Sequence, residues 1–213
     1  MMGWTPIAVY AFDVNGTLVD DTVIFLTTIN MMRRRYGLAS MPHEELRRRF
    51  GQPWTKIFTD GGVVRTDEEF YESYNEIYTS FAPAECAPGA LDTLLRLREL
   101  GFRLAIVTAQ KYWVSERSLR RFLQMNLFLE THFGIGDKAS VLRGISDSLG
   151  PLAYVGDQVG DALHAKKAGA TSVAYTGGIH SEDMLRAVEP DYVIHAFPAL
   201  VSLPVEAYRS PSA

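Results

Sequence analysis

The chain is poor in features that mark membrane proteins and disulfide-stabilised proteins. It has one cysteine, Cys86, in 213 residues, which excludes an internal disulfide and a metal site built from several cysteines. No apolar run reaches the roughly 18 to 20 residues that a membrane-spanning helix needs, and residues 1–6 lack the basic start and long apolar stretch of a signal peptide. We therefore expect a cytoplasmic protein without a membrane partner.

The chain also lacks a surplus of basic charge, because 21 lysines and arginines stand against 25 aspartates and glutamates and leave a formal charge of −4. Proteins that bind nucleic acid usually carry such a surplus, so we expect no nucleic-acid partner. Two arginine triplets, at residues 33–35 and 47–49, are local exceptions. Three consecutive residues cannot share one helix face, so we expect these triplets on solvated helix surfaces. The composition leaves a monomer and a homodimer equally open.

Four short apolar runs predict buried parallel strands, each followed by small or polar residues and then by a helical pattern. The predicted strands are residues 7–12, 102–107, 152–155 and 171–175, with a weaker fifth at 191–194. The predicted helices between and after them are residues 90–99, 113–124, 138–149, 159–168 and 181–187. This alternation predicts an α/β fold with a doubly wound, mainly parallel, Rossmann-like sheet.

One long segment after the first strand breaks this alternation and shows helical periodicity throughout. Its predicted helices run from a cap at Asp20 or Asp21 to Arg35, from Pro42 onward, near residues 54–58, and over residues 67–81. The segment has about 65 residues, whereas an ordinary connection has roughly 4 to 6. We therefore predict an inserted α-helical domain at residues 20–82, within a core domain formed by residues 1–19 and 83–213.

Polar residues follow the first two predicted strands, at the sheet edge where ligands bind in open α/β folds. The first strand leads into Asp13, Asn15 and Thr17, and the side chains at positions 13 and 15 should point the same way. A carboxylate there can attack an electrophile, but the amide beside it cannot carry a proton. The second strand leads into Thr108 and Ala109, a hydroxyl and backbone amides suited to holding an anion.

Further charged residues lie near the later strands. Lys138 precedes the third of the four stronger strands, which ends in Gly-Asp followed by a second aspartate four residues on. Asp157 and Asp161 are therefore spaced to share one helical face. Lys111, just after the second strand, is a rival to Lys138 as the lysine of an anion site.

Taken in order, these segments resemble the four motifs of the haloacid dehalogenase superfamily, and most closely its phosphoglycolate-phosphatase-like branch. The matching parts are Phe-Asp-Val-Asn-Gly-Thr-Leu-Val-Asp at residues 12–20, Thr108, Lys138, and Gly-Asp-x-x-x-Asp at residues 156–161. The helical insertion resembles that superfamily's helical cap, and residues 51–54 resemble the cap loop that selects substrate. The resemblance covers nearly the whole chain.

The resemblance implies a Mg²⁺-dependent hydrolase of a small phosphorylated metabolite, with a cap that closes over the site. Asp13 corresponds to the nucleophile that forms an aspartyl-phosphate, and Lys138 to the lysine that neutralises Asp13 and the transferring group. The implied Mg²⁺ ligands are Asp13, the backbone carbonyl of Asn15, Asp157 and Asp161. The implied phosphate-binding residues are Thr17, Thr108 and Ala109.

Asn15 departs from the superfamily pattern, because its phosphatases carry an aspartate there as general acid and base. Asparagine cannot deliver a proton, so we expect a rate loss of about 10² to 10⁴-fold. With Mg²⁺ and Lys138 balancing the carboxylates of Asp13, Asp157 and Asp161, the formal charge of the site is zero, whereas an aspartate at position 15 would make it negative. We therefore expect phosphate binding to be retained and turnover to be weakened.

Two other interpretations stay open. The first is a 2-haloacid dehalogenase or a phosphonate hydrolase of the same fold, since a halide leaves without an acid. The paired carboxylates after residue 156 favour phosphate over halide chemistry, and Trp54 lies near the place where phosphonate hydrolases carry a cap lysine, although Lys56 is nearby. The second is a phosphate-binding pseudo-enzyme or a substrate-trapping variant.

Three further residues have open roles. Trp54 and Phe58 are equally suited to the core of the cap and to a wall of the substrate site. His180, which follows two glycines beyond the 171–175 strand, is the histidine to test as a substitute acid.

Overall fold

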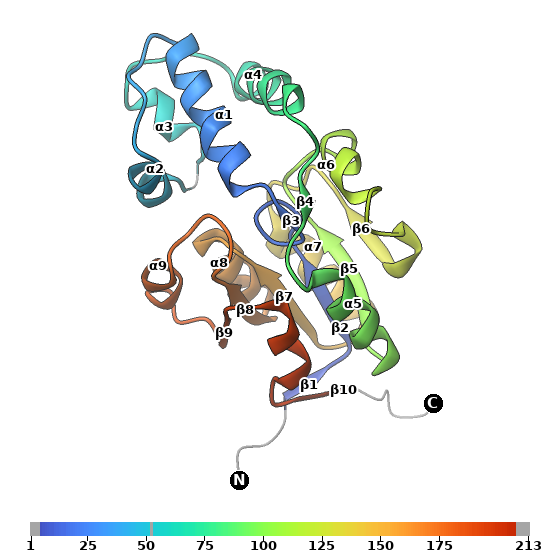
Figure 1. Cartoon of the computed structure of the whole chain (residues 1–213). Helices are drawn as coiled ribbons and strands as arrows, with labels where there is room; N and C mark the ends of the chain where they lie inside the picture. Colours follow the sequence, from blue (N-terminus) through green and yellow to red (C-terminus); the bar gives the residue numbers. More distant parts are fainter. Residues whose placement is uncertain (1–4, 52, 208–213) are drawn as a thin grey trace. The chain divides into compact units, whose positions relative to one another are not determined.

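A computed structural model describes residues 5–51 and 53–207 of the chain. The chain divides into two compact units (Figure 1). We call residues 1–20 and 85–213 the sheet unit, and residues 21–84 the helical unit. Within the described ranges, no helix combines the length and the apolar character that a membrane span requires.

A six-stranded sheet forms the centre of the sheet unit, and all neighbouring strands in it are parallel. The strand order is β6-β5-β2-β7-β8-β9. The strands are β2 (Val9–Phe12), β5 (Arg103–Val107), β6 (Glu130–His132), β7 (Leu152–Gly156), β8 (Thr171–Tyr175) and β9 (Tyr192–Ile194). The predicted α/β class and the doubly wound parallel sheet are confirmed.

Helices cover both faces of this sheet, and the alternation of side chains along β2 shows why. Val9 and Ala11 pack in one core cluster with Leu142 of α7 (Lys138–Leu149) and with Ala165 of α8 (Val159–Ala168). Tyr10 and Phe12, which alternate with them along the strand, point to the opposite face, where the ring of Phe12 stacks on Phe197 of the 3₁₀ helix η2 (Phe197–Ser202). The remaining helices of this unit are α5 (Ala90–Glu99), α6 (Tyr112–Leu119), η1 (Met125–Leu127) and α9 (Glu182–Arg186).

Two small sheets complete the sheet unit. β1 (Thr5–Ile7) pairs in parallel with β10 (Val205–Ala207), and β3 (Val19–Asp20) pairs antiparallel with β4 (Glu85–Cys86). The second pair joins the two points at which the chain leaves the sheet unit and returns to it.

Some predicted boundaries are wrong. The strand predicted at residues 7–12 is two strands, because the chain bends at Ala8, whose amide donates to the carbonyl of Pro151 over 2.6 Å. The helix predicted at residues 113–124 ends at Leu119, and the turn that follows brings Leu123 into the core. β6 was not predicted, because Glu-Thr-His contains no apolar run.

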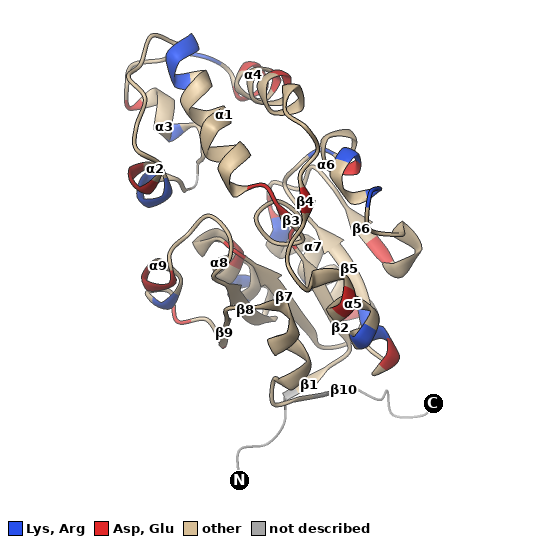
Figure 2. Cartoon of the chain, in the orientation of Figure 1, with Lys and Arg blue, Asp and Glu red and all other residues tan. Residues whose placement is uncertain are grey.

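The helical unit consists of α1 (Thr22–Arg35), α2 (His43–Arg49), α3 (Lys56–Thr59) and α4 (Asp67–Ser80). Figure 2 shows acidic residues at the start of α2 and basic residues at its end, the arrangement that the helix dipole favours. A capping box between Thr66 and Glu69 begins α4.

An aromatic cluster fills the core of this unit. The ring of Trp54 contacts those of Phe58, Phe70, Tyr71 and Tyr74. Phe58 is fully buried. These contacts place Trp54 and Phe58 in the core of the helical unit, while Gln52, within the loop predicted to select substrate, lies outside the described residues.

One prediction about the charged residues of this unit is wrong, and a second is right about the position of the residue but not about its hydrogen bond. Arg33 is buried rather than solvated, because its guanidinium donates to the carbonyls of Ala39 and Ile57. Asp21 occupies the N-cap position of α1, as predicted for Asp20 or Asp21, but its side chain makes no capping hydrogen bond there. It accepts a 2.6 Å hydrogen bond from the hydroxyl of Tyr78 instead.

Candidate functional site

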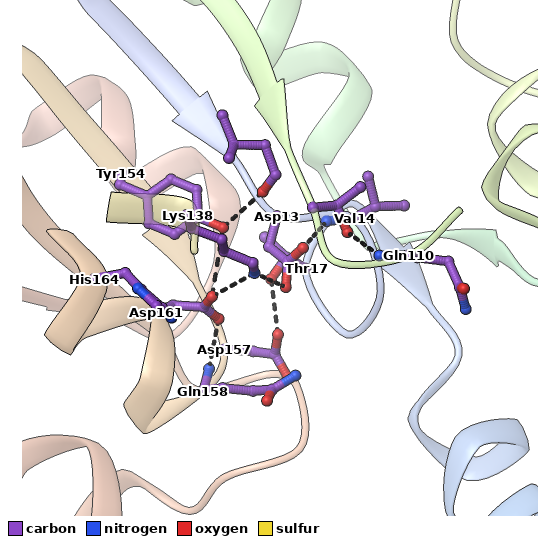
Figure 3. A network of polar contacts seen from close by, with 12 residues as sticks. Asp13, Val14, Thr17, Gln110, Lys138, Tyr154, Asp157, Gln158, Asp161 and His164 are labelled. Carbon is purple, nitrogen blue, oxygen red and sulfur yellow. Dashed lines mark hydrogen bonds and ion pairs between the residues drawn. The ribbon is translucent and has the colours of Figure 1, made fainter. Parts of the chain in front are cut away.

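Three buried carboxylates lie together at the carboxyl ends of two neighbouring strands (Figure 3). Asp13 follows β2, Asp157 follows β7, and Asp161 lies in the first turn of α8. Each is no more than 4% exposed, and one oxygen from each lies within 4.8 Å of the others. Because β2 and β7 are parallel neighbours, their ends open on the same edge of the sheet.

Lys138 lies among these carboxylates as the first residue of α7. Its Nζ is 3.0 Å from Asp13 Oδ2 and 2.7 Å from Asp161 Oδ1. Burial by itself lowers the pKa of Lys138, but the attraction of Asp13 and Asp161 outweighs it and raises that pKa above its ordinary value. Lys111 is exposed, so Lys138 is the lysine that the fold brings to the carboxylates.

The charges of this cluster do not balance without a further cation. Three carboxylates and one ammonium carry a formal charge of −2, in a place where water is nearly excluded. Burial raises the pKa of Asp13, although Lys138 opposes it. Burial also raises the pKa of Asp157 well above its usual range, and Asp161 and Asp13 reinforce this. A divalent cation held by oxygen ligands would remove the imbalance, and carboxylate oxygens are the ligands that Mg²⁺ takes.

Asp157 is fixed on several sides. Its Oδ1 accepts a 3.0 Å hydrogen bond from the Thr17 hydroxyl, and its Oδ2 accepts a 2.7 Å hydrogen bond from the amide of Ile179. Gly16 and Gly178 approach so closely that an added Cβ would lie 2.4 and 2.2 Å from Asp157 Oδ2. Gly16 also has a φ of +71°, which favours glycine.

Asp13 is oriented by the turn that follows it and by the end of β5. The amide of Val14 donates to Asp13 Oδ1 over 2.8 Å, and the Thr108 side chain also hydrogen-bonds to this carboxylate. The Thr108 hydroxyl accepts from the amide of Gln110. Thr108 therefore contributes its side chain to the site, as its place after the second predicted strand suggested.

The two carboxylate oxygens of Asp161 have different partners. One oxygen pairs with Lys138, while the other accepts from the amide of Gln158 and so closes the capping box that begins α8. The geometry of the carboxylate cluster thus depends on the start of this helix.

The remaining predicted site residues lie on the adjoining loops. Asn15 is half-buried in the turn after β2, and Ala109 is half-buried in the loop after β5. Thr17, predicted as a phosphate ligand, directs its hydroxyl to Asp157. His180 is buried, and its Nδ1 accepts a 2.9 Å hydrogen bond from the amide of Val159. In the helical unit, Lys56 is exposed and pairs with Asp60.

Sequence reasoning missed the contributions of Gly178 and Ile179. The paired glycines at 177 and 178 were a usable signal, because glycine after a buried strand often marks a close approach of backbone to another group. Tyr154, whose hydroxyl lies 3.4 Å from Asp161 Oδ1, was also missed. In the sequence it appears only as one apolar residue of a strand.

Comparison with known proteins gives matches over most of the chain. Residues 10–135 match the family model of haloacid dehalogenase-like hydrolases, and residues 130–200 match a second model described as HAD-hydrolase-like. The pyrophosphatase PpaX of Halalkalibacterium halodurans is 26% identical over 204 residues, which cover 90% of this chain and 94% of that protein. A phosphoglycolate phosphatase of Agrobacterium fabrum is 27% identical over 214 residues, which cover 92% and 91%.

Solved structures share the fold. The haloacid dehalogenase-like family protein SP0104 from Streptococcus pneumoniae matches with a TM-score of 0.77 at 22% identity, covering 92% of this chain and 97% of that one.

Proposed function

The chain belongs to the family of haloacid dehalogenase-like hydrolases, in its phosphoglycolate-phosphatase-like branch, and on this basis we propose that it is a Mg²⁺-dependent phosphatase acting on a small phosphorylated metabolite. The observation that carries the proposal is the buried cluster of Asp13, Asp157 and Asp161, with Lys138 as its cation. A site with this charge suits a metal ion and a phosphate that bind together.

In the proposed reaction the carboxylate of Asp13 attacks phosphorus, the bond to the leaving oxygen breaks, and an aspartyl-phosphate forms. Water then attacks this intermediate, releasing phosphate and restoring the carboxylate. Lys138 offsets the negative charge of Asp13 and of the phosphoryl group, which otherwise repel each other. The Thr108 hydroxyl and the Ala109 amide hold the phosphoryl oxygens, and Thr17 fixes Asp157.

We assign the Mg²⁺ ligands to Asp13, the backbone carbonyl of Asn15, Asp157 and Asp161. When bound, the ion would neutralise the phosphate and polarise its oxygens. The donor set supports this assignment, since three buried carboxylates with one ammonium need a further positive charge. Because the proposed ligand at position 15 is a backbone carbonyl, asparagine there leaves metal binding intact.

Asn15 favours a second candidate function, that of a protein which holds phosphate and turns it over slowly. An amide cannot protonate a leaving alkoxide or deprotonate water. A substrate with a good leaving group, such as an acyl phosphate, needs little protonation and would suffer least.

We further propose that residues 20–82 form the cap domain and select the organic part of the substrate. Two relatives of nearly equal identity are named for different substrates, pyrophosphate and phosphoglycolate, so overall similarity does not single out a substrate for this chain. The expectation of a cytoplasmic monomer or homodimer without a nucleic-acid partner stays a prediction.

A panel of phosphomonoesters, an acyl phosphate and 2-haloacids, assayed with and without Mg²⁺, tests the proposal. We expect phosphate release that requires Mg²⁺ and is fastest with the acyl phosphate. Asp13→Asn, which removes the nucleophile while nearly keeping its size, should abolish it. Chloride release from 2-haloacids without metal would overturn the phosphatase proposal in favour of a dehalogenase.

A further inference from the structure

The side chain of Tyr154 lies along one face of the sheet, and its hydroxyl is 3.4 Å from Asp161 of the carboxylate cluster. It lies in the middle of β7, is 1% exposed, and packs in the core cluster on the α7 and α8 face. Its hydroxyl donates a 2.8 Å hydrogen bond to the carbonyl of Val107. Val107 ends β5, which is separated from β7 by β2, so the side chain spans one complete strand.

Small side chains on the neighbouring strands leave room for the tyrosine ring. Ala11 of β2 is the register partner of Tyr154, and Ala105 of β5 is the partner of Ala11 on the other side. Both side chains are small and fully buried in the same cluster. A larger residue at position 11 would occupy the space through which the tyrosine reaches β5.

The ring of Tyr154 also faces the lysine of the site (Figure 3). The Nζ of Lys138 lies 5.5 Å from the ring centroid, within the range in which an aromatic face attracts a cation. Asp13 and Asp161 contact the same ammonium. The tyrosine ring therefore adds a third, uncharged contact to the two carboxylates.

We propose that Tyr154 is a positioning residue that fixes the ammonium of Lys138 relative to Asp13 and to the end of β5. The ring supports the ammonium, while the hydroxyl ties the ring to the carbonyl immediately before Thr108. This inference rests on the phosphatase proposed above, because it assigns to Lys138 the task of neutralising the transferring phosphoryl group.

The chemistry of the tyrosine suits a fixed donor. The hydroxyl is buried with the rest of the side chain and donates to the carbonyl of Val107. The phenol does not exchange protons with substrate in this role. Its effect on the reaction passes through the placement of Lys138.

Three variants separate positioning from packing. Tyr154→Phe keeps the ring and loses the hydroxyl, whereas Tyr154→Leu loses both. Tyr10→Leu is the matched control, because Tyr10 is also a fully buried tyrosine, on neighbouring β2, but its ring contacts Phe12 and Phe102 on the opposite face. We expect kcat to fall about tenfold or more in Tyr154→Leu relative to Tyr10→Leu, and by less than about fivefold in Tyr154→Phe.

A measurement independent of activity examines Lys138 directly. In ¹⁵N-lysine-labelled protein, with Lys138→Met for assignment, the buried ammonium should give a slowly exchanging signal. We expect the signal to persist in Tyr154→Phe and Tyr10→Leu, and to shift or broaden in Tyr154→Leu. An unchanged Lys138 signal in folded Tyr154→Leu, or equal kcat in the two leucine variants, overturns the inference. Absence of phosphatase activity in the unsubstituted chain would instead count against the proposed function, and the Lys138 signal would still decide the placement.

Discussion

Thr17 donates its hydroxyl proton to Asp157 Oδ1 over 3.0 Å, and so joins the turn after β2 to a strand end 140 residues later in the chain. Both residues are fully buried. This hydrogen bond fixes one oxygen of the carboxylate, while the amide of Ile179 fixes the other. The orientation of Asp157 is therefore set before any ligand arrives.

Removing the Thr17 hydroxyl should weaken the site without unfolding the protein. Thr17→Val keeps the shape of the side chain but leaves Asp157 Oδ1 without this donor. We expect Mg²⁺ affinity, measured by calorimetry, to fall by about 10- to 100-fold, the usual effect of losing a partner of a metal ligand. Thr27→Val is the control, because the Thr27 hydroxyl makes a solvent-exposed hydrogen bond within its own helix, to the carbonyl of Val23. Equal affinities in the two variants would contradict the role given to Thr17.

Restoring an acid at position 15 should have opposite effects on turnover and on phosphate binding. In Asn15→Asp we expect kcat to rise by about 10² to 10⁴-fold, because the new carboxyl can protonate the leaving oxygen and activate water. The added negative charge should weaken the binding of inorganic phosphate in the presence of Mg²⁺. Steady-state kinetics and calorimetry measure the two effects. A tighter phosphate complex in Asn15→Asp would refute the charge argument.

A methyl group at position 178 should displace Asp157. In Gly178→Ala the new Cβ would lie 2.2 Å from both the Cβ and Oδ2 of Asp157, so carboxylate or loop must move, at a cost of about 1 to 3 kcal/mol in stability. Gly136→Ala is the matched control in the same unit, since an added Cβ there meets nothing within 4 Å. Thermal unfolding with and without Mg²⁺ should show that only Gly178→Ala loses the stabilisation by metal.

The stabilisation by Mg²⁺ should grow with pH. The pKa of Asp157 and that of Asp13 are raised by burial, so in the metal-free protein each carboxyl favours folding when protonated, and this contribution is lost as the pH rises through the raised pKa. The pKa of Lys138 is also raised, so its contribution is lost only at still higher pH. We expect the gain in Tm on adding Mg²⁺ to be larger at about pH 8 than at about pH 5.5. An equal gain at both values would show that protons and metal do not compete.

Much of the fold and part of the site follow from local patterns in the sequence. Lys138 begins α7 and Val159 begins α8 where helical periodicity placed them. The strand ends carrying Asp13 and Asp157 were found because apolar runs stop abruptly before them. These signals are local, and the carboxyl ends of all strands in a parallel sheet lie at the same edge. Finding each strand end was therefore enough to place Asp13 and Asp157 together.

The missed features depend on partners far away in the chain. Arg33 is buried because the carbonyls of Ala39 and Ile57 accept from it, and no pattern around residue 33 reveals those acceptors. The contact of Tyr154 with Val107 requires the strand order of the sheet, which periodicity does not give. The same holds for Ile179, whose amide bonds to Asp157 from the loop after β8.

Because of the hydrogen bond from Ile179 to Asp157, the site is completed late in the synthesis of the chain. Asp13, the proposed nucleophile, is made early, but the backbone amide that donates to Asp157 Oδ2 is made only when residue 179 has been added. A chain that ends before residue 179 therefore contains the three aspartates of the site but lacks the amide that holds Asp157 Oδ2 in place.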